Sequence, residues 1–122
     1  MNQVTFTGVI ATDPRVGQTN SGTKTYNARI AVPKRVRRDG AVNADFFNFS
    51  IYGRSAEIAG ERLKRGMHVV LTGRLQNRPF QVGDRRITTD ELIVQRWEFA
   101  QAPEQNDQTE QEGETKTENE NQ

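Results

Sequence analysis

The residues of this chain that could form a functional site are aromatic and cationic side chains. The chain has no cysteine and a single histidine, His68. This composition excludes a disulfide framework and most zinc sites, and it offers only His68 as the base of a catalytic Ser–His pair. No pair of acids, nucleophile with a base, or glycine-rich phosphate loop stands out. We therefore expect a protein without catalytic activity, metal or cofactor, in which His68 lies at a strand edge or subunit contact.

Charge divides the chain into two parts. Residues 101–122 carry seven carboxylates against Lys116, with Ala102 as the one aliphatic side chain. Such a segment buries too little apolar surface to offset the entropy of ordering, so we expect a disordered acidic tail. Residues 1–100 carry 16 basic and 9 acidic side chains and all nine aromatics. They predict one basic globular domain with a polyanionic partner.

The basic side chains of the body form candidate contacts to that partner. Four of them crowd into residues 34–38, a loop where like charges repel unless an anion lies among them. The alternative for any one of them is an ordinary solvated position. The candidates are Arg29, Lys34, Arg35, Arg37, Arg38, Arg74, Arg78, Arg85 and Arg86. No apolar run resembles a signal peptide or a membrane span, so a soluble, cytoplasmic protein without membrane contact is expected.

Alternation of apolar and polar residues predicts half-buried strands over residues 4–10, 24–32 and 44–53. In the third strand one face carries Phe47, Phe49 and Ile51, and the other carries Phe46, Asn48, Ser50 and Tyr52. A strand of a small barrel buries one face only. We therefore expect Phe46 and Tyr52 to be exposed.

The remaining elements complete an all-β order. A helix is predicted over residues 55–65, with Ser55 as its N-cap, an apolar stripe and an end at Gly66. The stripe consists of Ile58, Ala59 and Leu63. Strands are predicted over 68–75, running on toward Phe80, and over 86–94, with a turn between them at 82–85. We expect Trp97 and Phe99 to seal the end of the last strand. Three strands, one helix and two strands fit a five-stranded OB-fold barrel with the helix between strands 3 and 4; periodicity also permits another small β-barrel.

Several motifs in order resemble the bacterial single-stranded DNA-binding protein family over about residues 1–99. These are an N-x-V-x-x-x-G start, a D-P, an aromatic residue before Y-G, and L-K-x-G followed by G-R-L-x-x-R. In this chain they stand as MNQVTFTGVIATDPRV, SGTKTYNARIAV, DFFNFSIYGRSAEIAGERLKRGMHVVLTGRLQNRPF and RITTDELIV. Each fragment alone is a weak signal, whereas the ordered set is specific.

The resemblance implies sequence-independent binding and protection of single-stranded DNA during replication, recombination and repair. The positions that the family uses for base stacking match Phe46, Tyr52 and Phe80, although Phe80 could also pack at a barrel rim. Two departures are present. Val36 stands where the family usually carries an aromatic residue, and Asn48 stands where some members carry a basic one.

The resemblance also implies a homotetramer located in the cytoplasm at the nucleoid. The family's acidic tail ends in a Pro-Phe tip that replication and repair proteins recognise, whereas this chain ends ENENQ. We expect weak recruitment of those partners and a tail that competes electrostatically for the basic face; a phage, plasmid or competence-type member also fits. The alternatives in other classes are a protein-interaction module on the same barrel and an OB-fold RNA chaperone.

Overall fold

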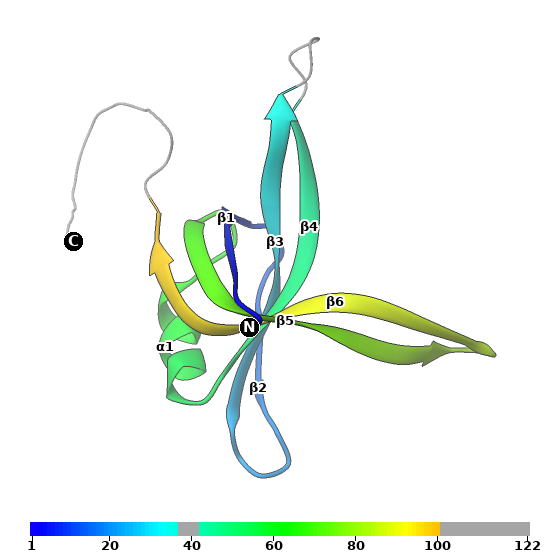
Figure 1. Ribbon diagram of the computed structural model, residues 1–122. Helices are drawn as coiled ribbons and strands as arrows, with labels where there is room; N and C mark the ends of the chain where they lie inside the picture. The colour runs from blue at the N-terminus through cyan, green and yellow to red at the C-terminus, as the bar shows by residue number, and fades with distance from the viewer. Residues whose placement is uncertain (37–41, 101–122) are drawn as a thin grey trace.

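A computed structural model describes residues 1–36 and 42–100 of the chain (Figure 1). Its elements are β1 (Val4–Ile10), β2 (Arg15–Gln18), β3 (Lys24–Val36), β4 (Val42–Tyr52), α1 (Arg54–Arg62), β5 (His68–Val82) and β6 (Arg85–Phe99). The expected tail at 101–122 and the predicted contacts Arg37 and Arg38 lie outside the described residues, as does the side chain of Arg35. No helix in the described part is long and apolar enough to cross a membrane.

Five strands close into a ring of backbone pairings. The sheet order is β1-β5-β6-β4-β3-β2, and β1 also pairs with β3, through Val9 opposite Ala31 and Ile10 opposite Ile30. This second pairing of β1 returns the sheet to its start. The helix lies between β4 and β5, which are the third and fourth strands of the ring. The predicted all-β barrel order with one helix is confirmed.

Strand β2 is a sixth strand that the sequence analysis did not predict. Its four residues are all exposed, and it pairs with the beginning of β3, from Arg15 opposite Asn27 to Gln18 opposite Lys24. Backbone hydrogen bonds hold this strand, and it buries no apolar face of its own. Without alternating burial it leaves no period-two signal in the sequence.

The core fills the inside of the ring. Tyr26 and Phe49 stack there with ring centroids 5.9 Å apart, and the Tyr26 hydroxyl donates a hydrogen bond to the Leu63 carbonyl oxygen at 2.9 Å. Burial raises the pKa of Tyr26 to about 12. The buried apolar residues are Ile10, Tyr26, Ile30, Phe49, Ile51, Ala56, Ala59, Leu63, Val69, Leu71, Leu92 and Val94.

Two glycines allow neighbouring strands to approach closely where the barrel curls. A Cβ on Gly8 would lie 2.1 Å from the Ala31 carbonyl oxygen. A Cβ on Gly73 would lie 1.9 Å from the Ile93 carbonyl oxygen, beside the register shift between β5 and β6. Real Cβ atoms do not come this close to backbone, so any side chain here would push the strands apart.

The helix begins one residue earlier than predicted, and Ser55 does not cap it. Gly53, with φ of +80°, is the N-cap, and no side chain bonds to the free N–H groups there. The Ser55 hydroxyl instead accepts a hydrogen bond from Trp97 Nε1 at 3.0 Å. A left-handed φ suits glycine, which explains why Gly53 and not Ser55 precedes the first turn.

The buried stripe of α1 also differs from the predicted one. Ala56, Ala59 and Leu63 are fully buried, whereas Ile58 is 38% exposed. The helix ends at Arg62, and Gly66 lies beyond it with φ of +92°. The predicted stripe is therefore correct for Ala59 and Leu63 and wrong for Ile58, because residues three and seven positions after Ala56 share its side of the helix and Ile58 does not.

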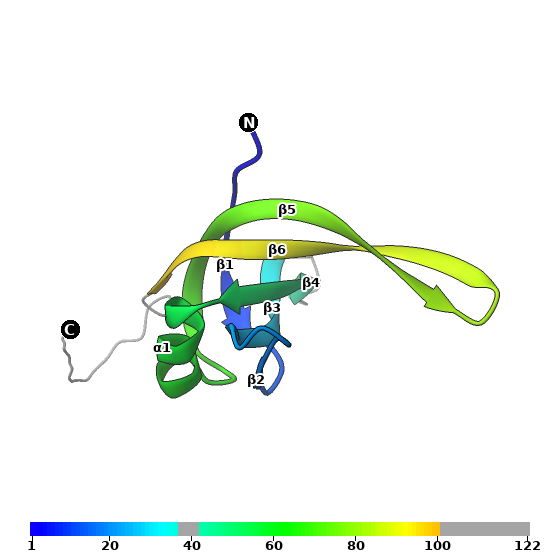
Figure 2. The ribbon, with the colours of Figure 1, turned by 90° about the horizontal axis from the view of Figure 1, so that it is seen from below.

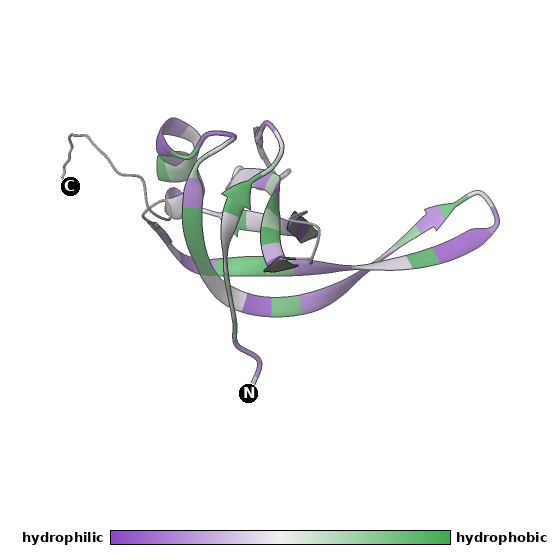
Figure 3. Ribbon diagram, turned by 90° about the horizontal axis from the view of Figure 1, so that it is seen from above, coloured by the Kyte–Doolittle hydropathy of each residue, from purple (hydrophilic) through white to green (hydrophobic). Residues whose placement is uncertain are grey.

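Strands β5 and β6 form a hairpin much longer than the barrel, seen as a projecting ribbon in Figures 1 and 2. The turn falls at Gly83–Asp84, inside the predicted 82–85 segment. We call the projecting residues 76–90 the arm. In Figure 3 the arm alternates between hydrophilic and hydrophobic segments. Most arm residues are exposed, unlike the barrel ends of the same strands.

Candidate functional site

The strand register joins the outward-pointing residues of four strands into one surface. Arg29 of β3 is opposite Asn48 of β4, Asn48 is opposite Glu91 of β6, and Glu91 is opposite Gln76 of β5. Residues that pair across a sheet lie on the same side of it. We call this surface the outer face; its residues are Asn27, Arg29, Phe46, Asn48, Ser50, Tyr52, Arg74, Gln76, Arg78, Phe80, Thr89, Glu91 and Ile93.

A groove of about 770 Å³ lies along this face. It is lined by Thr12, Asp13, Arg15, Asn27, Ala28, Arg29, Asn48, Phe49, Arg78, Phe80, Thr89 and Glu91. The groove therefore brings together three predicted site residues that lie far apart in the sequence, Arg29, Arg78 and Phe80. Its mixture of cations, polar groups and apolar surface suits an elongated anionic ligand with flat apolar parts.

Phe46 lies on the outer face with a cation above its ring. Its exposed fraction is 51%, whereas Phe49 on the opposite face is 1% exposed. The Arg29 guanidinium carbon is 5.4 Å from the Phe46 ring centroid, within the range of a cation–π contact. The predicted exposure of Phe46 is confirmed.

Tyr52 and Phe80 are also exposed, each at 44%. Tyr52 ends β4 on the same face as Phe46, as alternation predicted. Phe80 lies on the arm opposite Ile87 and lines the groove. Large aromatic side chains left half in water lose the free energy that burial would give them, so the exposure of all three rings needs an explanation other than fold stability.

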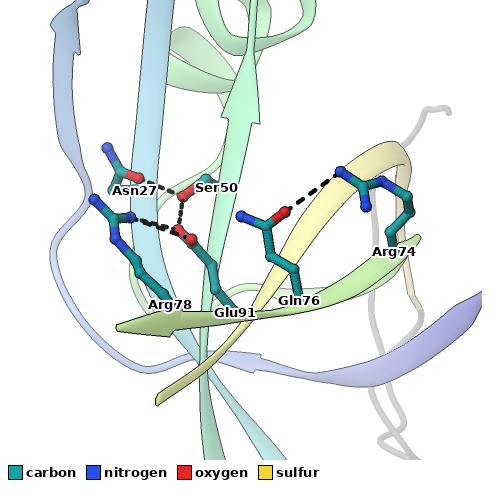
Figure 4. A network of polar contacts seen from close by, with 6 residues as sticks. All are labelled: Asn27, Ser50, Arg74, Gln76, Arg78 and Glu91. Carbon is teal, nitrogen blue, oxygen red and sulfur yellow. Dashed lines mark hydrogen bonds and ion pairs between the residues drawn. The ribbon is translucent and has the colours of Figure 1, made fainter. Parts of the chain in front are cut away.

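A polar network crosses the floor of the groove (Figure 4). Arg78 Nη1 donates to both carboxylate oxygens of Glu91, at 3.1 and 3.0 Å. The Ser50 hydroxyl donates to Glu91 Oε2, and Asn27 Oδ1 lies 2.5 Å from the same hydroxyl oxygen. Glu91 is 3% exposed, and the sequence analysis missed both Glu91 and Asn27.

A signal for Glu91 was present in the sequence. A two-residue turn at Gly83–Asp84 makes Val82 pair with Arg85, and this register places Gln76 opposite Glu91. Arg78 then lies diagonally across from Glu91 on the same face, within reach of a long side chain. The predicted turn at 82–85 thus fixes the register of the hairpin, and this register brings Glu91 and Arg78 together.

The other predicted cations divide into three groups. Arg74 lies on the outer face, where its Nη2 donates to Gln76 Oε1 at 3.3 Å. Lys34 forms an ion pair with Asp45 at 3.1 Å, and both side chains are about half exposed. Arg85 and Arg86 lie at the end of the arm, and alternation turns Arg86 to the side opposite the outer face. The structure therefore places Arg29, Arg74 and Arg78 on one surface, and Arg86 away from it.

A second aromatic cluster lies at the far end of β6. Trp97 packs partly buried against the core and meets Phe99 edge-on at 5.8 Å. Phe99 is 50% exposed, with the Arg62 guanidinium 5.8 Å from its ring. Trp97 seals the strand end as predicted, whereas Phe99 stays in contact with water. Among residues 1–36 and 42–100, no group of three potential metal ligands occurs.

Comparison with known proteins identifies relatives of the whole described body. The model of the "Single-strand binding protein family" matches residues 1–100. A single-stranded DNA-binding protein of Fusobacterium nucleatum is 32% identical over 105 residues, covering 84% of this chain and 68% of that protein. Single-stranded DNA-binding protein 2 of Clostridium acetobutylicum is 30% identical over 102 residues, covering 81% and 76%.

A similar fold occurs in a solved structure. The crystal structure of a small single-stranded DNA-binding protein from Streptomyces coelicolor superimposes with a TM-score of 0.67 and 22% sequence identity. The match covers 80% of this chain and 93% of that one. At this identity the likeness concerns the fold, and it agrees with the closed ring of strands described above.

Proposed function

Because the chain belongs to the single-strand binding protein family, we propose that it binds single-stranded DNA without sequence preference along the outer face. The curated relatives carry names that state this activity. The proposed role is binding and protection without chemistry, during replication, recombination and repair. We further propose that the protein acts as a homotetramer in the cytoplasm, at the nucleoid.

One observation carries this proposal: exposed aromatic rings and cations share a single continuous face. An unpaired strand offers two handles that do not depend on sequence, the phosphate charge and the flat faces of its bases. Phe46, Tyr52 and Phe80 are exposed rings suited to the bases. In proteins of this class, stacking of one base on an aromatic side chain contributes about 1–3 kcal/mol.

The cations of the same face suit the phosphates. Arg29 and Arg74 lie on the surface that carries the rings, and Arg85 lies farther along the arm. Each phosphate neutralised on single-stranded DNA changes the slope of log affinity against log salt by about −0.7. Binding through about five phosphates would thus give a slope near −3.5.

The test is a titration of labelled oligo(dT) by fluorescence anisotropy at several salt concentrations, with light scattering for mass. The proposal predicts tight binding that weakens with salt, weak binding to duplex DNA, and the mass of a tetramer. Equal affinity for RNA of the same length would favour an RNA chaperone. Absence of binding to any nucleic acid would overturn the proposal in favour of a protein-interaction module.

A further inference from the structure

A buried carboxylate lies directly beneath one cation of the outer face. Glu91 is 3% exposed, whereas the Arg78 side chain above it is 59% exposed. One Arg78 nitrogen donates to both carboxylate oxygens, at 3.1 and 3.0 Å. A negative charge under a surface that receives a polyanion opposes binding, so Glu91 requires an explanation beyond general electrostatics.

The network fixes Glu91 from two other strands. The Ser50 hydroxyl contacts both Glu91 Oε2 and the Asn27 amide, yet it carries one proton. The carboxylate is the stronger acceptor and takes that proton. The hydrogen bond from Ser50 of β4 thus holds the carboxylate, which in turn holds the Arg78 guanidinium.

Arg74 provides a contrast on the same strand and the same face. Its guanidinium donates to the neutral oxygen of Gln76 at 3.3 Å, and no ion pair links it to a carboxylate in the described part of the chain. The charge of Arg74 is therefore available to an anion. The charge of Arg78 is matched by a buried carboxylate that stays in contact with it.

We infer that Glu91 is a positioning residue that makes Arg78 a fixed platform for bases and not a counterion for phosphate. This inference rests on the proposed function of the outer face. A guanidinium is planar and stacks on flat rings, and its position two residues before Phe80 places both flat groups along one strand of the groove. A pair that is already neutral releases few counterions when DNA binds.

The salt dependence of oligo(dT) affinity separates the two roles of an arginine. Arg74→Gln should make the slope of log affinity against log salt shallower by about 0.7, because one phosphate contact is lost. The double variant R78Q/E91Q should keep the wild-type slope and bind about tenfold more weakly at every salt concentration. Glu91→Gln alone should steepen the slope by about 0.7, because the freed Arg78 becomes a counterion.

A measurement without DNA tests the positioning directly. Side-chain ¹⁵N relaxation should show the Arg78 guanidinium to be more rigid than that of Arg74 in the wild type and equally mobile in Glu91→Gln. Thermal unfolding of each variant confirms that the comparison is made on folded protein.

Two results would overturn the inference. The first is a slope for R78Q/E91Q as shallow as that of Arg74→Gln, which would make Arg78 an ordinary phosphate contact. The second is equal mobility of the two guanidinium groups in the wild type. A wild-type protein that fails to bind oligo(dT) would overturn the proposed function itself, and the relaxation measurement would still decide whether Glu91 positions Arg78.

Discussion

Phe46 and Phe49 lie three residues apart on β4 and face opposite sides of the same sheet. Phe49 is 1% exposed and stacks with Tyr26 inside the barrel, whereas Phe46 is 51% exposed beneath the Arg29 guanidinium. Burial stabilises the fold through Phe49, and Phe46 forgoes that stabilisation. The difference teaches that the inner face of β4 maintains the barrel and that the outer face is available for a ligand.

The largest expected effect is on stability, at the inner face. Phe49→Ala removes a fully buried ring and leaves a cavity, so it should lower the free energy of unfolding by about 3–5 kcal/mol. Phe46→Ala should change it by about 0.5 kcal/mol or less, because the ring is half in water. Urea unfolding followed by circular dichroism measures both. Equal losses in the two variants would remove the distinction between the faces.

The inner face should also respond to alkaline pH. The pKa of Tyr26 is about 12 in the folded protein, against 10.0 for a free tyrosine. The unfolded chain loses this proton first, so stability is complete below pH 10 and falls as the pH rises toward 12. The expected loss is on the order of 3 kcal/mol from this group. Comparison of wild type with Tyr26→Phe in urea at several alkaline pH values isolates it, since the phenylalanine variant lacks that dependence.

The outer face should respond in binding and not in stability. Phe46→Ala and Tyr52→Ala should each weaken oligo(dT) binding roughly tenfold, corresponding to about 1–3 kcal/mol of lost stacking. The Ile58→Ala variant on the exposed side of α1 is a matched control that should bind normally. If the two aromatic variants unfold instead, the rings belong to the core, and the account of the two faces is wrong.

The smallest expected effect comes from the acidic segment. Residues 101–122 carry a net charge of −6 next to a basic body. Deleting them should raise the affinity for oligo(dT) a few-fold at low salt and leave it unchanged at high salt, since salt screens charge competition. Unchanged affinity at low salt would contradict competition between this segment and the DNA.

Most of the correct predictions came from the alternation of apolar and polar residues along the strands. The pattern of Phe47, Phe49 and Ile51 against Phe46 and Tyr52 identified both faces of β4 because side chains of a strand alternate strictly. The hairpin turn was also predicted from local residues, because it contains Gly83, whose φ of +60° is a conformation that favours glycine. These features depend on neighbours in the sequence.

Features that depend on distant contacts were harder to predict. Strand β2 buries nothing, so its pairing with β3 left no trace in the hydrophobic pattern. Ser55 has the composition of a helix cap, yet Trp97, 42 residues away, contacts its hydroxyl. Glu91 reads as a surface acid until the register of the hairpin places it beside Arg78. Tertiary contacts decided each case against the local preference.

The most direct test of the two faces compares DNA that has bases with DNA that lacks them. Oligo(dT) and an abasic oligonucleotide of equal length carry the same phosphates, and only the first can stack on Phe46, Tyr52 and Phe80. The wild type should bind oligo(dT) more tightly, by at least about a hundredfold, and the triple alanine variant should keep only the roughly tenfold preference that stacking on Arg78 gives. Equal binding of both strands by the wild type would contradict the account.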